Sequence, residues 1–173
     1  MKITYEIKFL DYWHLGSGLS AGAKLDSSVT KDSNNIAFVP GKTLKGMVRD
    51  MAELFDDEAF ISKCFGEEGV KMGACFFSNA TLNQDLYRQT VSNRLQDYLY
   101  DEITSTKIEN GMVVNGSLRE AEVVIPLSLQ GEIENIPNEF SEKIEASLKM
   151  IKRMGSKRNR GLGRCTISIK ELS

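Results

Sequence analysis

The order of hydrophobic periodicities along the chain constrains its fold more than any other feature. Residues 3–9 alternate apolar and polar side chains, as a strand with one buried face does. Residues 43–55 and 140–151 repeat apolar side chains at helical spacing. Three further strands are predicted over 74–82, 121–129 and 165–172. The resulting β-α-β-β-α-β order predicts an α+β, ferredoxin-like fold, in which two helices cover one face of an antiparallel sheet.

Turn-forming residues place the ends of these elements. Pro40 and Gly41 predict a turn before the first helix, and Thr43 is its expected N-cap. The second helix is expected to begin near Pro137 and to end at Gly155. A proline at position 126 interrupts one of the later strands and indicates a bulge or an edge position.

Residues 103–116 predict a β-hairpin, because Asn110 and Gly111 form a pair that favours a tight turn. The stretch 84–100 is ambiguous and is compatible with a short helix. We therefore expect a single domain over residues 1–173, with loops longer than the fold needs and an inserted hairpin at about 103–118.

Charge is concentrated in one short segment. The chain has 22 Lys and Arg against 24 Asp and Glu, and the net charge of −2 argues against bulk coating of nucleic acid. Residues 149–164, however, hold seven basic residues and no acid, and removing these seven charges leaves −9 on the rest. The seven are Lys149, Lys152, Arg153, Lys157, Arg158, Arg160 and Arg164. Residues 53–68 form an acidic block, so the average charge conceals a basic patch on an acidic body.

The basic segment is also rich in glycine, a combination that favours phosphate binding. Arg158 and Arg160 alternate, so an extended loop would present both on one side. Gly161 and Gly163 would let a backbone approach closely. The alternative is a solvated loop that only keeps the protein soluble.

The first predicted helix carries a second basic cluster. Lys42, Lys45 and Arg49 are spaced i, i+3 and i+7, which places them on one helix face near a positively polarised N-terminus. This cluster could bind a second phosphate, or it could be an ordinary polar helix face. A nucleotide-binding P-loop is excluded, because position 36 is Ile where that motif needs Gly.

Two loop aspartates and the single histidine are the remaining candidates for chemistry. Asp26 or Asp32 could bind a divalent ion or help to deprotonate a ribose 2′-hydroxyl. Loop aspartates more often cap turns, and from the residues alone this is the favoured interpretation. His14 could act as a general acid or base in a metal-free ribonuclease, although a lone histidine at a strand end is more often structural.

The cysteines and the apolar runs bear on metal sites and location. Cys64, Cys75 and Cys165 form no CxxC pair, and with only one histidine a Cys/His zinc site is excluded. No apolar run has the length of a membrane span, and the first residues do not form a secretory signal. We therefore expect a reduced, cytoplasmic protein that does not bind a membrane.

Several separate motifs together resemble a known family. They are residues 14–18 (HLGSG), 26–32 (DSSVTKD), 37–49 (AFVPGKTLKGMVR), 65–66 (FG), 76–80 (FFSNA), 116–122 (GSLREAE) and 155–164 (GSKRNRGLGR). This ordered set resembles the RAMP superfamily of CRISPR-associated proteins. It looks most like the backbone subunit that repeats along the guide RNA in type III effector complexes.

The resemblance implies a modified RRM-like, ferredoxin-like fold, whose copies stack into a filament along CRISPR guide RNA with other complex subunits. Each copy would hold the guide by its backbone, and base pairing with complementary target RNA would supply specificity. The hairpin at 103–118 would wedge into the guide–target duplex. The expected RNA-binding residues are Lys42, Lys45, Arg49, Lys157, Arg158, Arg160, Gly161, Gly163 and Arg164.

Asp26 falls where the type III subunit carries an acidic residue that assists target RNA cleavage with a divalent cation, such as Mg²⁺. No tightly bound cofactor is expected. One departure from the family pattern is Asn79, because relatives often carry an aspartate there. The alternatives are a precursor CRISPR RNA-processing endoribonuclease that uses His14, a non-catalytic capping or backbone paralogue, and an interaction module that never contacts RNA.

Overall fold

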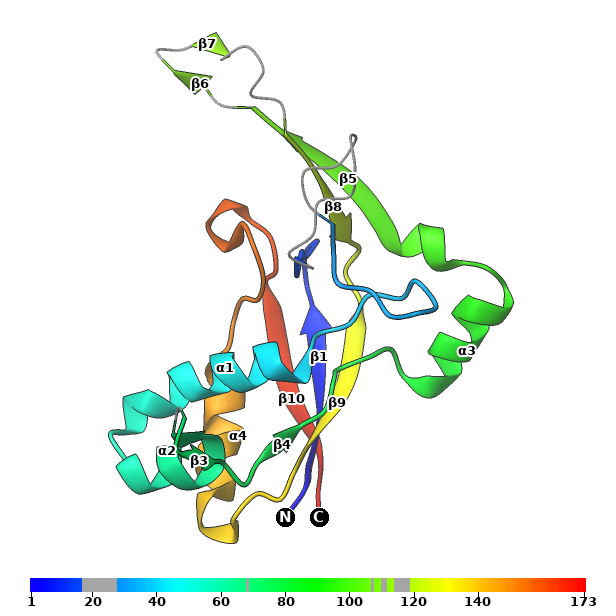
Figure 1. The fold of residues 1–173 in the computed structure, drawn as a ribbon. Helices are drawn as coiled ribbons and strands as arrows, with labels where there is room; N and C mark the ends of the chain where they lie inside the picture. The colour runs from blue at the N-terminus through cyan, green and yellow to red at the C-terminus, as the bar shows by residue number, and fades with distance from the viewer. Residues whose placement is uncertain (17–27, 68, 107, 110–111, 114–118) are drawn as a thin grey trace.

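The computed structural model describes residues 1–16, 28–67, 69–106, 108–109, 112–113 and 119–173. A four-stranded sheet forms its centre (Figure 1). The strands are β1 (Ile3–Phe9), β4 (Phe76–Phe77), β9 (Ser128–Glu134) and β10 (Cys165–Leu172). Their order is β10-β1-β9-β4, and every neighbouring pair is antiparallel. The predicted α+β, ferredoxin-like fold is therefore confirmed.

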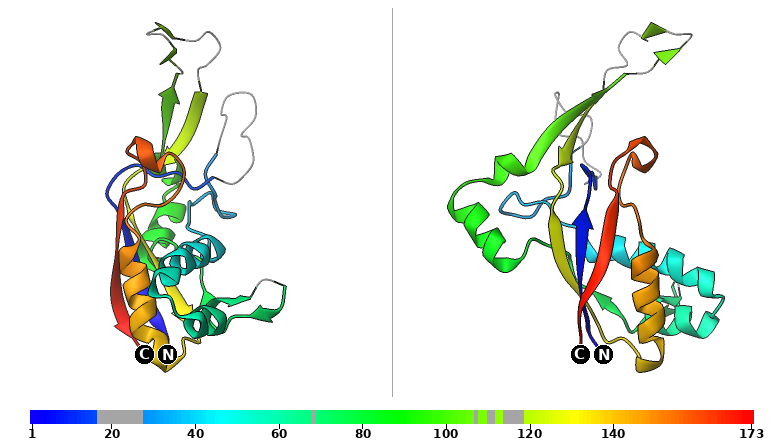
Figure 2. Two further views of the ribbon diagram at one scale, coloured as in Figure 1. Left: turned by 90° about the vertical axis from the view of Figure 1, so that its left-hand side faces the viewer. Right: turned by 180° about the vertical axis from the view of Figure 1, so that it is seen from behind.

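Three helices lie together on one face of this sheet (Figure 2). They are α1 (Gly41–Ala52), α2 (Glu58–Phe65) and α4 (Ser141–Met150). Leu44 and Val48 of α1 and Leu148 of α4 are fully buried against the inward side chains of β1, such as Tyr5 and Ile7. The alternation in β1 and the helical spacing in α1 and α4 thus predicted which side chains form the core.

A long hairpin extends from the end of the sheet that lies away from the two termini (Figure 1). Its arms are β5 (Tyr100–Ser105) and β8 (Arg119–Val124), which pair antiparallel. Two short strands, β6 (Ile108–Glu109) and β7 (Met112–Val113), pair farther out. The arms are longer than the sequence indicated, and the predicted turn at Asn110 and Gly111 lies outside the described residues.

The remaining elements are short. They are β2 (Gly66–Glu67), β3 (Lys71–Met72), α3 (Gln84–Ser92) and the 3-10 turns Glu53–Phe55, Gln96–Leu99, Asn138–Phe140 and Arg158–Arg160. The helix α3 lies apart from the other helices, beside the base of the hairpin (Figure 1). It occupies the first part of the stretch that the sequence left ambiguous.

Four boundaries differ from the sequence prediction. Helix α1 begins at Gly41 with Pro40 as its N-cap, so Thr43 is not the cap. The apolar stretch 121–129 divides into β8 and β9, because Pro126 falls in the connection between them. Of the strand predicted over 74–82, only β4 is regular. Helix α4 ends at Met150, well before Gly155.

The acidic block also contains a helix that the sequence did not predict. The Asp57 carboxylate caps α2 by accepting a hydrogen bond from the backbone N–H of Phe60, at 3.0 Å. Phe60 and Cys64 of this helix are fully buried. The block therefore contributes to the core as well as to the acidic surface.

Candidate nucleic-acid interface

The basic loop, residues 151–164, connects α4 to β10 and has a closed neck. The backbone N–H of Ser156 donates to the carbonyl of His14 at 2.8 Å, and that of Met154 donates to Gly163 at 2.9 Å. A Cβ atom at Gly163 would lie 1.9 Å from the carbonyl oxygen of Met154, so only glycine fits there. The neck therefore holds the loop in one position against the chain that leaves β1.

The loop glycines have different roles from those that the sequence suggested. Gly163 is buried at the neck, where its missing side chain permits the contact between the two sides of the loop. Gly161 is exposed, has a φ of +88°, and a Cβ there would meet nothing within 4 Å. Of these two, Gly161 alone leaves open space for a ligand backbone.

Three cations at the tip of the loop are available for a ligand. Lys157, Arg158 and Arg160 make no ion pair or side-chain hydrogen bond within the described ranges. The segment Arg158–Arg160 is a 3-10 turn, so the loop is not extended here; Lys157 and Gly161 beside it have φ values of 56° and 88°. Residues 155–160 line a hollow of about 600 Å³ at this tip.

The other four basic residues of the segment are engaged within the protein. Lys149 pairs with Glu145, Lys152 with the carbonyl of Lys149, Arg153 with the carbonyl of Arg158, and Arg164 with Asp11. Arg164 remains exposed, and its Nε lies 3.0 Å from Asp11 Oδ2. Much of the segment's charge therefore helps to shape the loop, and the tip holds the free charge.

The second cluster lies along α1. Lys42 is exposed, Lys45 is half-buried, and Arg49 Nε lies 3.4 Å from Glu53 Oε1. The pKa of the Cys75 thiol lies below its ordinary value, mainly because of a hydrogen bond with Cys64 and in part because Lys45 is near. Lys42 and Lys45 are thus the cations of this helix that no carboxylate neutralises among the described residues.

The first turn of α1 is fixed by a side chain from beyond β4. The backbone N–H of Gly41 donates to Asn79 Oδ1 at 2.9 Å. A Cβ at Gly41 would lie 2.1 Å from the carbonyl oxygen of Phe77, so the helix start packs directly on the β4 backbone. Asn79, the departure from the family pattern, therefore acts as a cap here.

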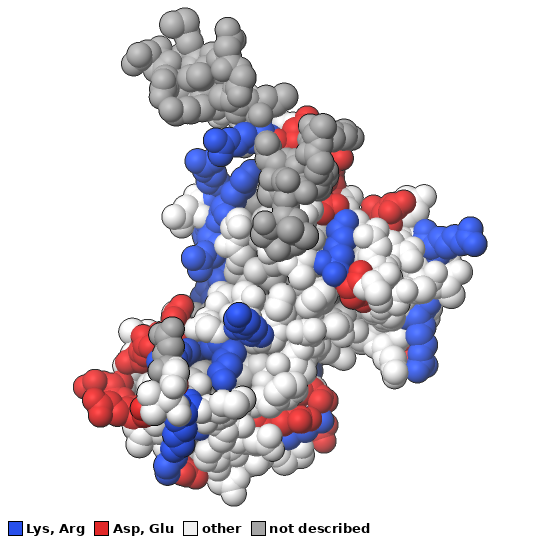
Figure 3. Space-filling model, in the orientation of Figure 1, with Lys and Arg blue, Asp and Glu red and all other residues white. Residues whose placement is uncertain are grey.

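Both clusters appear on the face shown in Figure 3, one over the basic loop and the other over α1. Acidic residues gather below them around α2, where Glu53, Asp56 and Glu58 are exposed. The opposite face of the sheet is different. Its central strands present polar side chains there, including Thr4 and Gln130, rather than the aromatic rows on which RNA-binding sheets stack bases.

His14 joins the basic loop to the hairpin. Its side chain is only 4% exposed, and its Nδ1 lies 2.6 Å from the carbonyl oxygen of Glu122 on β8. A carbonyl accepts only, so Nδ1 carries the hydrogen in the neutral ring. The carbonyl of His14 in turn accepts from Ser156 of the loop. This burial and these bonds favour a positioning role over proton transfer to RNA.

Of the two loop aspartates, Asp32 lies among the described residues. Asp26 lies outside the described residues, in the segment 17–27. Asp32 accepts hydrogen bonds from the N–H groups of Asn34 and Ile36, both at 2.9 Å, and from the Tyr87 hydroxyl at 2.6 Å. Asp32 therefore caps its own turn and ties that turn to α3, as loop aspartates commonly do.

The sequence did not single out Lys31 or Glu122. Their side chains form an ion pair at 2.6 Å, and the second carboxylate oxygen of Glu122 accepts from the N–H of Val29 at 3.1 Å. Only the motif over 116–122 hinted at Glu122, because the partners are far apart in the chain. Within the part of the chain described above, no group of three metal-ligating side chains is present, and none of the helices has the length and hydropathy of a membrane span.

These features define a ferredoxin-like α+β protein with a basic loop and a protruding hairpin at the same end of its sheet (Figure 1). The chain belongs to the RAMP superfamily, whose family model matches residues 6–166. The search of curated proteins returned no match.

Two solved structures share the fold over nearly the whole chain. One chain, from a cryo-EM structure of the type III-B Cmr-beta bound to cognate target RNA, is 12% identical with a TM-score of 0.77. The other, from the apo state of the type III-B Cmr-beta, is 13% identical with a TM-score of 0.72. Each alignment covers 98% of this chain and 97% of the other.

Proposed function

We propose that this protein is a backbone subunit of a type III CRISPR effector complex that binds guide RNA through the basic loop and α1. The observation that carries the proposal is the group of three free cations, Lys157, Arg158 and Arg160, on a loop whose neck is held rigidly. A fixed, positively charged hollow suits contacts with phosphates, which every guide sequence presents. Membership of the RAMP superfamily and the similarity to the type III-B chains support it.

Backbone contacts alone are what a programmable complex requires. Base pairing between guide and target supplies the sequence specificity, so the protein must hold any guide equally well. The acidic surface around α2 would repel RNA elsewhere on the molecule and so confine it to the two basic clusters. We propose that copies stack along the guide, with other subunits at the ends.

Cleavage of target RNA is a second part of the proposal and depends on Asp26. Mg²⁺ is commonly held by one or two carboxylates together with substrate phosphates, so one aspartate beside bound RNA is a suitable donor set. When bound, the cation would stabilise the charge that develops on the phosphate. Asp26 would hold it next to the scissile phosphodiester, and the fixed guide would position the target.

The experiment is to assemble the complex with guide RNA and to present complementary target RNA. The Asp26→Asn complex should bind guide and target as the wild type does and should lose target cleavage. Asp32→Asn is the matched control, because Asp32 is engaged with its own turn and Tyr87. If Asp26→Asn cleaves at the wild-type rate, the catalytic role is wrong. If the wild-type complex binds no guide, the whole proposal fails.

The processing-enzyme alternative is less favoured because His14 is buried and its Nδ1 is bonded to β8. In that alternative the isolated protein would cut precursor RNA without metal, and His14 would have to reach the scissile phosphate.

A further inference from the structure

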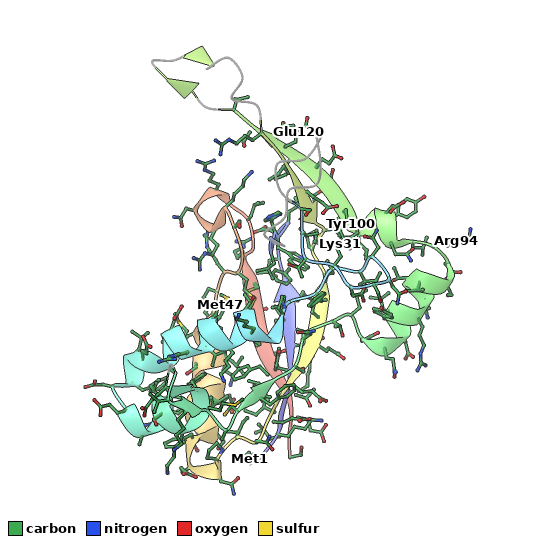
Figure 4. All side chains as sticks on the ribbon, viewed as in Figure 1. Met1, Lys31, Met47, Arg94, Tyr100 and Glu120 are labelled. Atoms are coloured by element: carbon green, nitrogen blue, oxygen red, sulfur yellow. The ribbon has the colours of Figure 1, made fainter. Side chains whose placement is uncertain are left out.

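Lys31 lies where three segments meet at the base of the hairpin. Its Nζ is 2.6 Å from Glu122 Oε1 on β8 and 3.7 Å from the centroid of the Tyr100 ring on β5. Figure 4 shows Lys31 and Tyr100 side by side at this point. One side chain therefore contacts both arms of the hairpin from a segment that packs into the body of the protein through Ile36 and Ala37.

The contacts of Lys31 are shielded from water. Its side chain is 21% exposed, and that of Glu122 is 12% exposed. The Tyr100 hydroxyl donates to the carbonyl of Asn35 at 2.7 Å, which holds the ring under the ammonium group. A partly buried pair of this kind is screened less by salt than a surface pair, and removal of one partner leaves the other charge partly buried and without its ion-pair partner.

The hairpin is attached to the body at an inner and an outer level, and between them the Tyr12 hydroxyl donates to Asp101 Oδ2 on β5 at 3.0 Å. At the inner level, backbone hydrogen bonds of 3.1 and 2.8 Å join Val124 to Trp13. At the outer level, two residues before Val124 on β8, Lys31 holds Glu122; its cation also lies over the ring of Tyr100, which pairs with Val124 at the inner level. Two levels of attachment are needed to fix the tilt of a protruding ribbon. His14 holds only the backbone of Glu122, whereas Lys31 holds the Glu122 side chain and also contacts β5.

We propose that Lys31 is a positioning residue that fixes the direction of the β5–β8 hairpin relative to the sheet and thereby controls engagement of target RNA rather than guide RNA. The second clause rests on the proposed function, in which the hairpin meets the guide–target duplex. The charge of Lys31 is satisfied by Glu122 and Tyr100, so Lys31 does not add to the phosphate-binding clusters.

The first test measures the hairpin directly in the full chain. Spin labels on cysteines introduced at exposed Thr104 and Ser168 would report the hairpin-to-sheet distance by double electron–electron resonance; the three native cysteines are buried. Lys31→Met should broaden or shift the distance distribution, and Lys31→Arg, which keeps the cation, should restore it. Lys8→Met, the same change at an exposed site on β1, should leave it unchanged. An unchanged distribution in Lys31→Met would overturn the proposal.

The second test measures RNA binding in the assembled complex. Lys31→Met should leave guide affinity unchanged and raise the dissociation rate of complementary target RNA about tenfold, equivalent to roughly 1.4 kcal/mol. Loss of guide affinity would instead place Lys31 among the phosphate contacts and contradict the inference. If the wild type binds no RNA while Lys31→Met still moves the hairpin, the proposed function fails and the positioning role of Lys31 stands.

Discussion

Neutralising the free cations of the basic loop should flatten the salt dependence of RNA binding. The variant replaces Lys157, Arg158 and Arg160 by Gln, because these three make no ion pair among the described residues. Each phosphate contact on a single strand contributes about 0.7 to the slope of log affinity against log salt, so the slope should fall by about 2. Between about 50 and about 200 mM salt, the wild type should therefore lose roughly 16-fold more affinity than the variant.

The assay is fluorescence anisotropy with a labelled single-stranded RNA, titrated at several salt concentrations. A second variant with Lys2 before β1, Lys8 on β1 and Lys170 on β10 replaced by Gln removes the same charge from residues outside the basic loop, and should keep the wild-type slope. Equal slopes for the two variants would show that net charge alone governs binding, and would refute the assignment of the loop as the RNA contact.

Three further predictions concern stability and reactivity. Gly163→Ala should destabilise the protein by about 2 kcal/mol or more in a thermal melt, because its Cβ would meet the Met154 carbonyl; Gly161→Ala, which meets open space, should cost about 1 kcal/mol. Equal losses would contradict the account of the neck. The hydrogen bond from Lys143 lowers the pKa of Asp57, so this carboxylate stabilises the fold above its unfolded pKa, and the effect is lost as pH falls through the folded value. Asp57→Asn should therefore lower Tm at pH 7, and a difference that did not shrink as the pH falls below the unfolded pKa of about 4 would contradict this. Burial raises the pKa of the Cys165 thiol to about 11, so alkylation at pH 8 should be slow in the native protein and fast in urea; rapid native labelling would be the opposing result.

The sheet and the helix faces could be predicted because they depend on local patterns. The alternation in β1 places Tyr5 and Ile7 in the core, and the spacing in α1 buries Leu44 and Val48. These predictions hold because folding buries apolar surface, so the apolar face of each strand or helix becomes its core face. The charge of the basic loop could be predicted for a different reason, since the side chains of six basic residues in one loop cannot all be buried.

The details that depend on distant partners could not be predicted. The start of α1 is set by Gly41 packing on the Phe77 carbonyl and by the Asn79 side chain, and no local signal carries that contact. The roles of Lys31 and Glu122 depend on residues 91 positions apart. Long-range pairs of this kind leave no periodicity in one sequence, so only the structure reveals that Lys31 contacts both arms of the hairpin at its base.

The charge of the basic loop could be predicted from its sequence, but its conformation could not. Its composition indicated phosphate binding, and the alternation of Arg158 and Arg160 would place both on one side of an extended loop. The left-handed conformations of Lys157 and Gly161 impose a 3-10 turn instead, which presents the cations around a hollow. Gly161 and Gly163 looked equivalent in the sequence but have different roles, because Gly163 closes the neck and Gly161 faces open space.

The most direct test of the central claim is to purify the protein from its native host under gentle conditions and to sequence the RNA that accompanies it. A backbone subunit of a type III effector complex should copurify with partner subunits and with small guide RNAs of CRISPR sequence. Recovery of the wild-type protein without RNA would contradict this claim. It would also be contradicted if the triple variant of Lys157, Arg158 and Arg160 retained as much RNA as the wild type.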